Sequence, residues 1–311
     1  MLSESDLSRP YGYVPTLSAT IIFVVLFSVS CAAIALHLGQ SIYYRIWWLL
    51  PTAVFSGLIE IMGWAGRVWS SVNASNLGPY EMQMTLTIIG PTPLLAASFV
   101  ILDKLIHIIG MQYSRLDPKW SVSVFVFCFE LPQVGLTSEQ DIVSLVIQAV
   151  GGGTAAVAVS KYNSPEKGGN IMLGGIVFQM FSMALFVVCG AEFLWRYFKD
   201  RPVRSLAQNS LMPDDTTAIA EPRTLTPKIK TMLGSVVFST LCLFIRSIYR
   251  TIELSNGFAG RIIHTQLYFN ILDGMMIVLA MYTLNIFHPG ILLADKPAEV
   301  EKECVSGIEK V

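Results

Sequence analysis

Apolar residues run along this chain in seven long stretches, separated by shorter polar segments. A membrane-spanning helix needs about 20 mostly apolar residues, whereas the strands of a membrane barrel alternate apolar and polar residues over about 10. The stretches are continuous, so the pattern predicts helices that satisfy their own backbone in lipid. The predicted spans are Thr16–Leu38, Ile46–Trp64, Met82–Leu102, Asp141–Ser160, Asn170–Leu194, Met232–Ile248 and His264–Phe287.

The predicted fold is therefore an all-α polytopic membrane protein, a bundle of seven transmembrane helices. Pro91 and Pro93 interrupt the third span, since proline cannot donate a backbone hydrogen bond. The expected organisation is an extracellular N-terminal tail at 1–15, a membrane domain at 16–291 that includes a cytosolic loop at 195–231, and a cytosolic tail at 292–311.

Composition supports this prediction. The chain of 311 residues is 53% hydrophobic and 14% charged, whereas soluble domains carry about 25% charged residues. This excludes a soluble enzyme and a disordered chain, and the net charge of −1 lacks the basic excess that nucleic-acid binding requires. The five cysteines are isolated from one another and are expected to be small buried apolar residues.

The distribution of lysine and arginine predicts the orientation. Fourteen fall in segments on the side of the C-terminus and six on the other side, so the C-terminus is expected in the cytosol and the N-terminus outside. Asn73-Ala74-Ser75 is a glycosylation sequon, and it lies in a loop that this orientation places outside. No basic segment precedes the first span, so we expect that span not to be cleaved as a signal peptide. We expect the protein to be an integral, multi-pass protein of the plasma membrane.

Ionisable residues within the spans are the candidate functional groups, because each costs about 2.5–3.5 kcal/mol on insertion scales. Glu60 and Arg67 lie two turns apart on one helix, and each is expected to have a partner on another helix. Arg246, Arg250 and Glu253 share one helix face, where Arg250 can reach Glu253. The pattern fits an ion-pair network that fixes helix packing, and equally a polar cavity or gate for a charged lipid headgroup. The candidate residues are Glu60, Arg67, Asp141, Gln148, Arg246, Arg250, Glu253 and Asp273.

Enzymatic and nucleotide motifs are missing from the sequence. There is no phosphate-binding G-x-x-x-x-G-K-[ST] segment, no H-E-x-x-H pair and no G-x-S-x-G elbow. We therefore expect no catalytic residue, no bound metal and no cofactor, and we exclude ATP-driven transport by this chain alone. Gly151, Gly152 and Gly153 lie inside the fourth span, where they fit close helix packing or a hinge.

Several local motifs, taken in order, resemble the fungal RTA-like family, also called lipid-translocating exporters. The resemblance covers about Tyr11 to Ile291. Its motifs are Tyr11-Gly12-Tyr13-Val14-Pro15; Gly57-Leu58-Ile59-Glu60-Ile61-Met62-Gly63-Trp64-Ala65-Gly66-Arg67; Leu77-Gly78-Pro79-Tyr80 with Gln83; Asp141-Ile142-Val143-Ser144 with Gln148 and the glycine triplet; Arg246-Ser247-Ile248-Tyr249-Arg250 with Glu253 and Gly257; Asp273; and His288-Pro289-Gly290.

The resemblance implies a seven-helix membrane protein without ATPase machinery. Family members are associated with release or flipping of sphingoid long-chain bases, with resistance to toxic amphiphiles such as aminosterols, and with porphyrin uptake. The expected function is thus ATP-independent translocation of a lipid or amphiphilic small molecule, with the bilayer as the other partner and no nucleic acid. A seven-helix receptor, or a stress-response membrane protein without transport activity, is the alternative. Protein partners stay open.

One segment departs from the family pattern. Phe127–Gln140 intervenes where the family passes almost directly from the aromatic start of helix four into the Asp141 motif. Its proline, glycine and glutamates oppose a continuous helix. We interpret it as an insertion at the cytosolic mouth of helix four, or as a retained intron in the gene.

Overall fold

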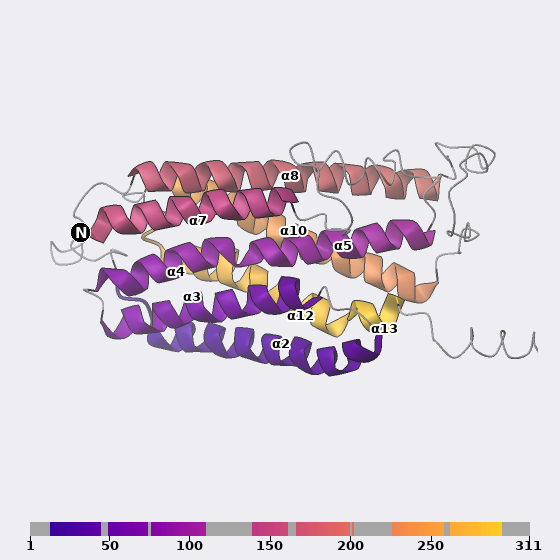
Figure 1. Cartoon of the computed structure of the whole chain (residues 1–311), viewed down its shortest axis with the longest axis horizontal. Coiled ribbons are helices and arrows are strands. Elements are labelled where there is room, and N and C mark those ends of the chain that lie inside the picture. Colours follow the sequence, from indigo (N-terminus) through magenta and orange to yellow (C-terminus); the bar gives the residue numbers. More distant parts are fainter. Residues whose placement is uncertain are drawn as a thin grey trace, which may run out of the picture.

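The computed structural model describes residues 13–44, 49–73, 76–109, 139–160, 166–199, 201, 226–257 and 262–293. These residues form helices and short connections, with no strand among them. The long helices lie side by side along the long axis of the molecule (Figure 1). The prediction of an all-α polytopic membrane protein is confirmed.

The described chain makes seven helical passes. Three of them are composite, because a short break or a π-helix interrupts each. In order, the passes are α2 (Leu17–Tyr44); the π-helix η1 (Leu50–Val54) with α3 (Phe55–Val72); α4 (Leu77–Ile89) with α5 (Pro91–Ile109); α7 (Glu139–Ser160); α8 (Glu166–Phe198); α10 (Pro227–Ser255); and α11 (Gln266–Tyr268) with the π-helix η3 (Phe269–Met275) and α12 (Met276–Ile286), followed by α13 (Pro289–Leu293).

Five of these passes are long and apolar enough to cross a membrane by length and composition. The other two, built on α3 and α7, are rich in glycine and polar residues. The third pass is the most enclosed, with 83% of its apolar window buried against 33% in the first and fifth. The α4–α5 pass therefore lies in the middle of the bundle.

Helix ends differ from the sequence prediction where charged residues are buried. The second pass continues to Val72, well beyond the predicted end at Trp64, so Arg67 lies inside α3. Likewise α10 continues to Ser255 and encloses Arg250 and Glu253. Hydropathy falls where charged residues gather and so ends a predicted span early, whereas a charge that has partners inside the bundle stays in the helix.

The predicted close packing of the fourth span is confirmed at the contact between α7 and α8. A Cβ at Gly151 would lie 2.5 Å from the backbone nitrogen of Met172, and one at Gly168 would overlap the backbone of Ala155. Small residues allow two membrane helices to approach this closely. Gly153 is different, since no atom lies within 4 Å of its ideal Cβ position.

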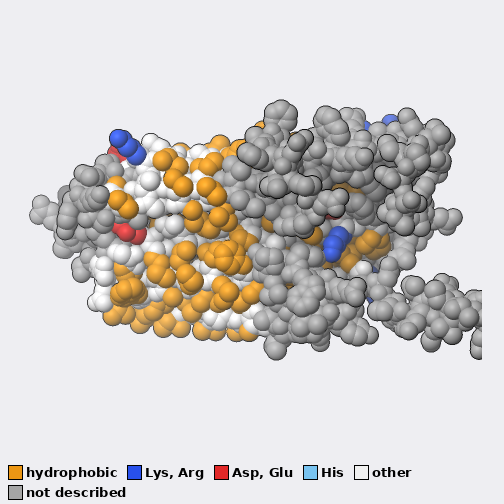
Figure 2. All heavy atoms as spheres, in the orientation of Figure 1, with side chains coloured by type: hydrophobic (Ala, Val, Ile, Leu, Met, Phe, Trp, Pro, Cys, Tyr) orange, Lys and Arg blue, Asp and Glu red, His pale blue; other side chains and the backbone are white. Residues whose placement is uncertain are grey.

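Apolar side chains form much of the described surface on the face of the bundle that Figure 2 shows. A helix in lipid is expected to expose apolar residues, because lipid tails offer polar groups no partners. The exposed residues include Ile22, Val25 and Val29 of α2, Phe181 and Val188 of α8, and Phe238 and Leu241 of α10.

Some predictions fall outside the described residues. These are residues 127–138 of the proposed insertion, most of the N-terminal tail, residues 200 and 202–225 of the cytosolic loop and the C-terminal tail beyond 293. The last two residues of the proposed insertion, Glu139 and Gln140, are the first two residues of α7. The orientation of the bundle stays a prediction.

Candidate functional site

A buried ion cluster joins the sixth and seventh passes. Nε of Arg250 donates a hydrogen bond of 2.8 Å to Oδ1 of Asp273, and Nη2 donates one of 2.8 Å to Oδ2. Nε of Arg246 lies 2.9 Å from Oδ1 of the same carboxylate. Arg250 and Asp273 are fully buried, and Arg246 is 4% exposed. A bidentate guanidinium–carboxylate pair fixes geometry as well as charge, so α10 and η3 are held in one register.

Glu253 completes the α10 side of this cluster. Its Oε2 accepts a hydrogen bond of 2.7 Å from Nη1 of Arg250, and its Oε1 accepts one of 3.0 Å from the Tyr249 hydroxyl. The predicted reach of Arg250 to Glu253 along one helix face is therefore confirmed. We name Arg246, Arg250, Glu253, Asp273 and Glu60 together the charge cluster.

The break between α4 and α5 supplies the cluster with backbone acceptors. Pro91 has no N–H, so the carbonyl of Thr87, four residues earlier, lacks its usual helical donor. Nη2 of Arg246 donates to that carbonyl, and Nη2 of Arg250 donates to the Thr87 hydroxyl at 2.8 Å. The proline that interrupts the third span thus creates an acceptor for an arginine of the sixth.

Glu60 contacts the same break at Gly90. The Glu60 carboxylate packs so closely on Gly90 that a Cβ atom at Gly90 would overlap its Oε1. Ser56, one helical turn before Glu60, donates a hydrogen bond of 2.7 Å to the Gly90 carbonyl. Glu60 is fully buried, within electrostatic range of Asp273, Arg246 and Arg250. Neither carboxylate oxygen has a hydrogen-bond partner among the described residues. The expected partners of Glu60 on another helix are therefore Arg246 and Arg250 of α10, which act on it electrostatically and without a hydrogen bond.

The same expectation is confirmed for Arg67. Its Nη2 donates to the Tyr13 hydroxyl at 2.8 Å, and its Nη1 donates to Oε1 of Gln83 at 3.3 Å. The guanidinium carbon also lies 4.4 Å from the ring centroid of Phe269, which in turn lies 5.0 Å from that of Arg250. One aromatic ring therefore contacts two arginines, and cation–π attraction adds to the stability of both.

The remaining candidates lie on α7. Gln148 donates to Oε1 of Gln179 at 2.8 Å, and Gln179 donates to the Thr92 hydroxyl at 3.2 Å. This chain of hydrogen bonds links the fourth, fifth and third passes, which gives Gln148 a role in packing. Asp141 lies in the first turn of α7, and its side chain is outside the described part. Asn73 ends α3 and is exposed, as a glycosylation acceptor must be.

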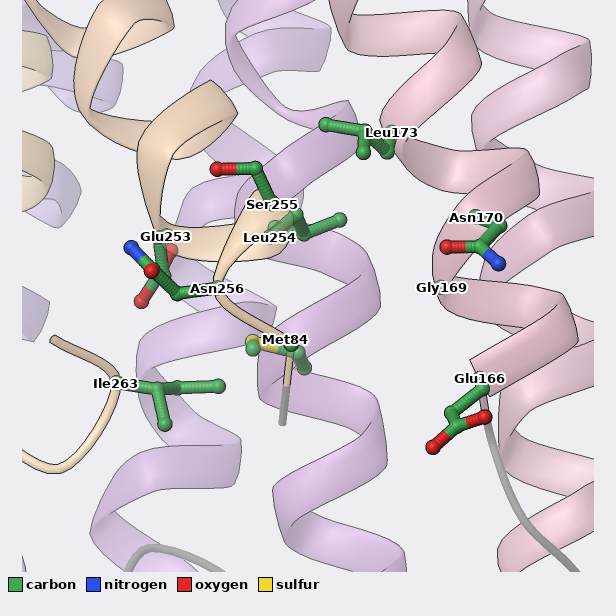
Figure 3. Close-up of a pocket in the computed structure, with 11 residues that line it drawn as sticks. Met84, Glu166, Gly169, Asn170, Leu173, Glu253, Leu254, Ser255, Asn256 and Ile263 are labelled. Atoms are coloured by element: carbon green, nitrogen blue, oxygen red, sulfur yellow. The ribbon is translucent and has the colours of Figure 1, made fainter. Parts of the chain in front are cut away.

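A pocket of about 290 Å³ opens beside Glu253, at the end of the bundle where α8 begins and α10 ends. Figure 3 shows Glu253 of α10 and Glu166 of α8 on opposite sides, with Met84 of α4 between them. Of its described lining residues, two are glutamates and none is lysine or arginine. The other lining residues are Gly169, Asn170, Leu173, Leu254, Ser255, Asn256, Gly257 and Ile263.

Sequence reasoning missed several parts of this site. It did not find Thr87 or Gly90, although Pro91 and Pro93 signalled a break whose freed carbonyls need donors. It also missed the π-helix at Phe269–Met275, which carries Asp273. Short π-helical turns occur frequently at functional sites. Glu166 gave no signal, since a glutamate at the start of a helix is common at any surface.

Comparisons with known proteins cover most of the chain. Residues 53–296 match the family model described as RTA1 like protein. The chain is 30% identical to "Sphingoid long-chain base transporter RSB1" of Saccharomyces cerevisiae, over 90% of this chain and 73% of that protein. It is 24% identical to "Protein RTA1" of the same organism, over 89% of this chain and 86% of that protein. A third relative, "Protein RTM1" of Saccharomyces cerevisiae, is 24% identical over 73% of this chain and 62% of that protein. No solved structure matches the chain significantly.

Proposed function

The chain belongs to the RTA1-like protein family, and we propose on that premise that it translocates single-chain lipids with a cationic headgroup, without ATP. A relative at 30% identity is named a transporter of sphingoid long-chain bases, which supports lipid transport as the broad activity. A sphingoid base has an ammonium group, two hydroxyl groups and one long apolar chain. The headgroup site must therefore combine anionic and hydrogen-bonding groups beside an apolar surface.

The pocket next to the charge cluster has this chemistry, and this observation carries the proposal. Glu166 and Glu253 supply carboxylates for the ammonium group, and Asn170, Ser255 and Asn256 supply donors and acceptors for the hydroxyls. The apolar lining residues Met84, Leu173, Leu254 and Ile263 adjoin the start of the alkyl chain.

The charge cluster gives a headgroup a polar region to move into. Glu253 belongs to both features: it lines the pocket and accepts hydrogen bonds from Arg250 and Tyr249. Buried charges in a membrane protein typically mark a substrate or ion path, because lipid offers no other compensation for them. An ammonium that binds Glu253 competes with Arg250 for the carboxylate, and this competition is a route for opening the cluster.

Flux in liposomes that contain only the purified protein tests the proposal. The probe is an NBD-labelled sphingoid base with a free amine, whose outer-leaflet fluorescence dithionite removes. We expect the wild-type protein to expose inner-leaflet probe without ATP, and the N-acylated probe, which has no ammonium, to stay protected. Absence of flux from folded protein, or equal flux of the two probes, refutes the proposal.

Glu253→Gln tests the site itself. The substitution keeps the shape of the side chain and removes a charge whose hydrogen bonds are worth about 1.5–3 kcal/mol, so we expect flux to fall by about tenfold or more. Glu192→Gln is the matched control, since Glu192 pairs with Arg196 on the partly exposed face of α8. Equal flux from the two variants would assign the headgroup site elsewhere.

A further inference from the structure

The charge cluster contains one carboxylate more than it has guanidinium groups. Glu60, Glu253 and Asp273 face Arg246 and Arg250. Asp273 accepts hydrogen bonds from Arg250, and Glu253 accepts them from Arg250 and Tyr249. Both oxygens of Glu60 lack a hydrogen-bond partner of ordinary geometry among the described residues, although the Trp64 side chain lies near this carboxylate. The surplus negative charge is thus located on Glu60.

The surroundings of Glu60 supply no further cation within the described part of the chain. Arg246 and Arg250 of α10 and Asp273 of η3 are the charged groups that act on it. The α4–α5 pass presents the backbone of Gly90. From α2, the aromatic ring of Phe23 stacks on Trp64, one turn along α3, and the Cys31 thiol packs at Gly57.

Arg67 does not balance this charge. It is seven residues from Glu60, which is about 10 Å along a helix, and it is held by Gln83, Tyr13 and the Phe269 ring. A buried carboxylate without a hydrogen bond is costly unless its charge is compensated, and the two guanidiniums of the cluster already pair with Asp273 and Glu253. A proton on Glu60 or a substrate cation provides that compensation.

We propose that Glu60 is an exchangeable proton-binding site, and that the charge cluster holds either one proton on Glu60 or one lipid ammonium. This inference rests on the proposed function and adds proton exchange as its energy coupling. In the resting cluster Glu60 is a carboxylic acid, and the remaining two carboxylates balance the two guanidiniums. When the ammonium binds, the Glu60 O–H bond breaks, the proton passes to water, and the new carboxylate balances the ammonium.

The contact of Glu60 with the helix break gives this exchange a structural consequence. Glu60 packs on Gly90, and Arg246 binds the carbonyl of Thr87, so both contact the last turn of α4 before Pro91. Loss of the proton at Glu60 strengthens its attraction to Arg246 and so alters the forces on this turn. Breaks of this kind are common bending points in helices.

Proton release on binding tests the inference without any transport step. The probe is a 2-amino-1,3-diol with an eight-carbon chain, added to detergent-purified protein in weakly buffered solution with a pH indicator. We expect release of about one proton per bound ligand by the wild type and by Glu192→Gln, and none by Glu60→Gln. Apparent affinity of the wild type should fall about tenfold per unit of decreasing pH where Glu60 is protonated, and that of Glu60→Gln should not.

A second measurement holds even where Glu60→Gln fails to fold. The infrared band of a protonated carboxyl group should be present in the ligand-free wild type and should disappear when the amine binds. The band should also be present in ligand-free Glu60→Asp, which keeps a carboxyl group at this position. Absence of the band, or binding of the amine without proton release, overturns the inference.

Liposomes with an internal pH dye separate this inference from the proposed function. Lipid flux together with counter-movement of protons supports both. Lipid flux without proton movement overturns the coupling and leaves the transport proposal standing. Proton release on binding with no flux in the wild type supports the proton site and refutes the transport proposal.

Discussion

The Arg250–Asp273 pair joins two helical passes through side chains that are both fully buried. Arg250→Gln leaves Asp273 with Arg246 as its remaining cation, and Asp273→Asn leaves Arg250 with Glu253. Removing one partner of a buried ion pair costs about 3–5 kcal/mol when the other charge stays buried without compensation. Because one partner remains in each single variant, we expect each variant to lose free energy of unfolding up to the lower end of this range.

The double variant decides whether the two groups act as a unit. With both charges removed, neither member of the pair faces an absent partner, although Glu253 still loses Arg250 and Arg246 still loses Asp273. The combined loss should therefore be smaller than the sum of the single losses. The coupling energy should lie toward the upper end of the range of about 0.5–3 kcal/mol that is found for contacting residues. Unfolding in SDS, followed by tryptophan fluorescence and circular dichroism, measures all four proteins under one condition.

The pair Glu192–Arg196 provides a matched control on α8. Its atoms approach to 2.7 Å, against 2.8 Å in the buried pair, yet the side chains of Arg196 and Glu192 are 15% and 36% exposed. Solvent screens such a pair, so its coupling should be only about 0.3–0.5 kcal/mol. Losses at Arg250 and Asp273 that add within about 0.5 kcal/mol would refute the argument that burial makes the cluster cooperative.

Two further predictions concern packing and orientation. Gly90→Ala places a methyl group against Oε1 of Glu60 and should cost about 1–3 kcal/mol of stability, whereas Gly153→Ala, with open space around it, should be neutral or stabilising by up to about 1 kcal/mol. The same SDS unfolding assay compares them, and equal losses would contradict the close contact. Asn73→Gln should abolish a glycosidase-sensitive mass increment of protein made in a eukaryotic cell, and an unglycosylated wild type would contradict the predicted outer location of that loop.

Much of the fold was predictable because lipid restricts the choices. A chain with long apolar stretches must form closed backbone hydrogen bonds within each span, so hydropathy located the passes. Their ends were less predictable. Hydropathy places Arg67, Arg250 and Glu253 near the limits of their spans, yet each lies inside its helix. Neighbouring passes supply partners for Arg67 and Arg250, whereas Glu253 is paired within α10 by Arg250 and Tyr249.

Part of the candidate site could also be predicted from the sequence. Helical spacing put Arg246, Arg250 and Glu253 on one face, and the cost of burying charge marked Asp273 and Glu60 as functional candidates. Spacing along a chain carries no information about which passes touch. It therefore did not predict that Asp273 would bind both arginines, or that Gln148 would belong to a different chain of hydrogen bonds.

The sequence by itself determined the helical membrane fold, its seven passes and the short set of charged residues at membrane depth, because each follows from local hydropathy and helical period. Tertiary structure alone decided how those charges are balanced. Only the folded bundle brings the break at Pro91 against Arg246 and Glu60 and pairs Asp273 with two guanidiniums. Charge balance depends on distances between helices, and these arise from packing.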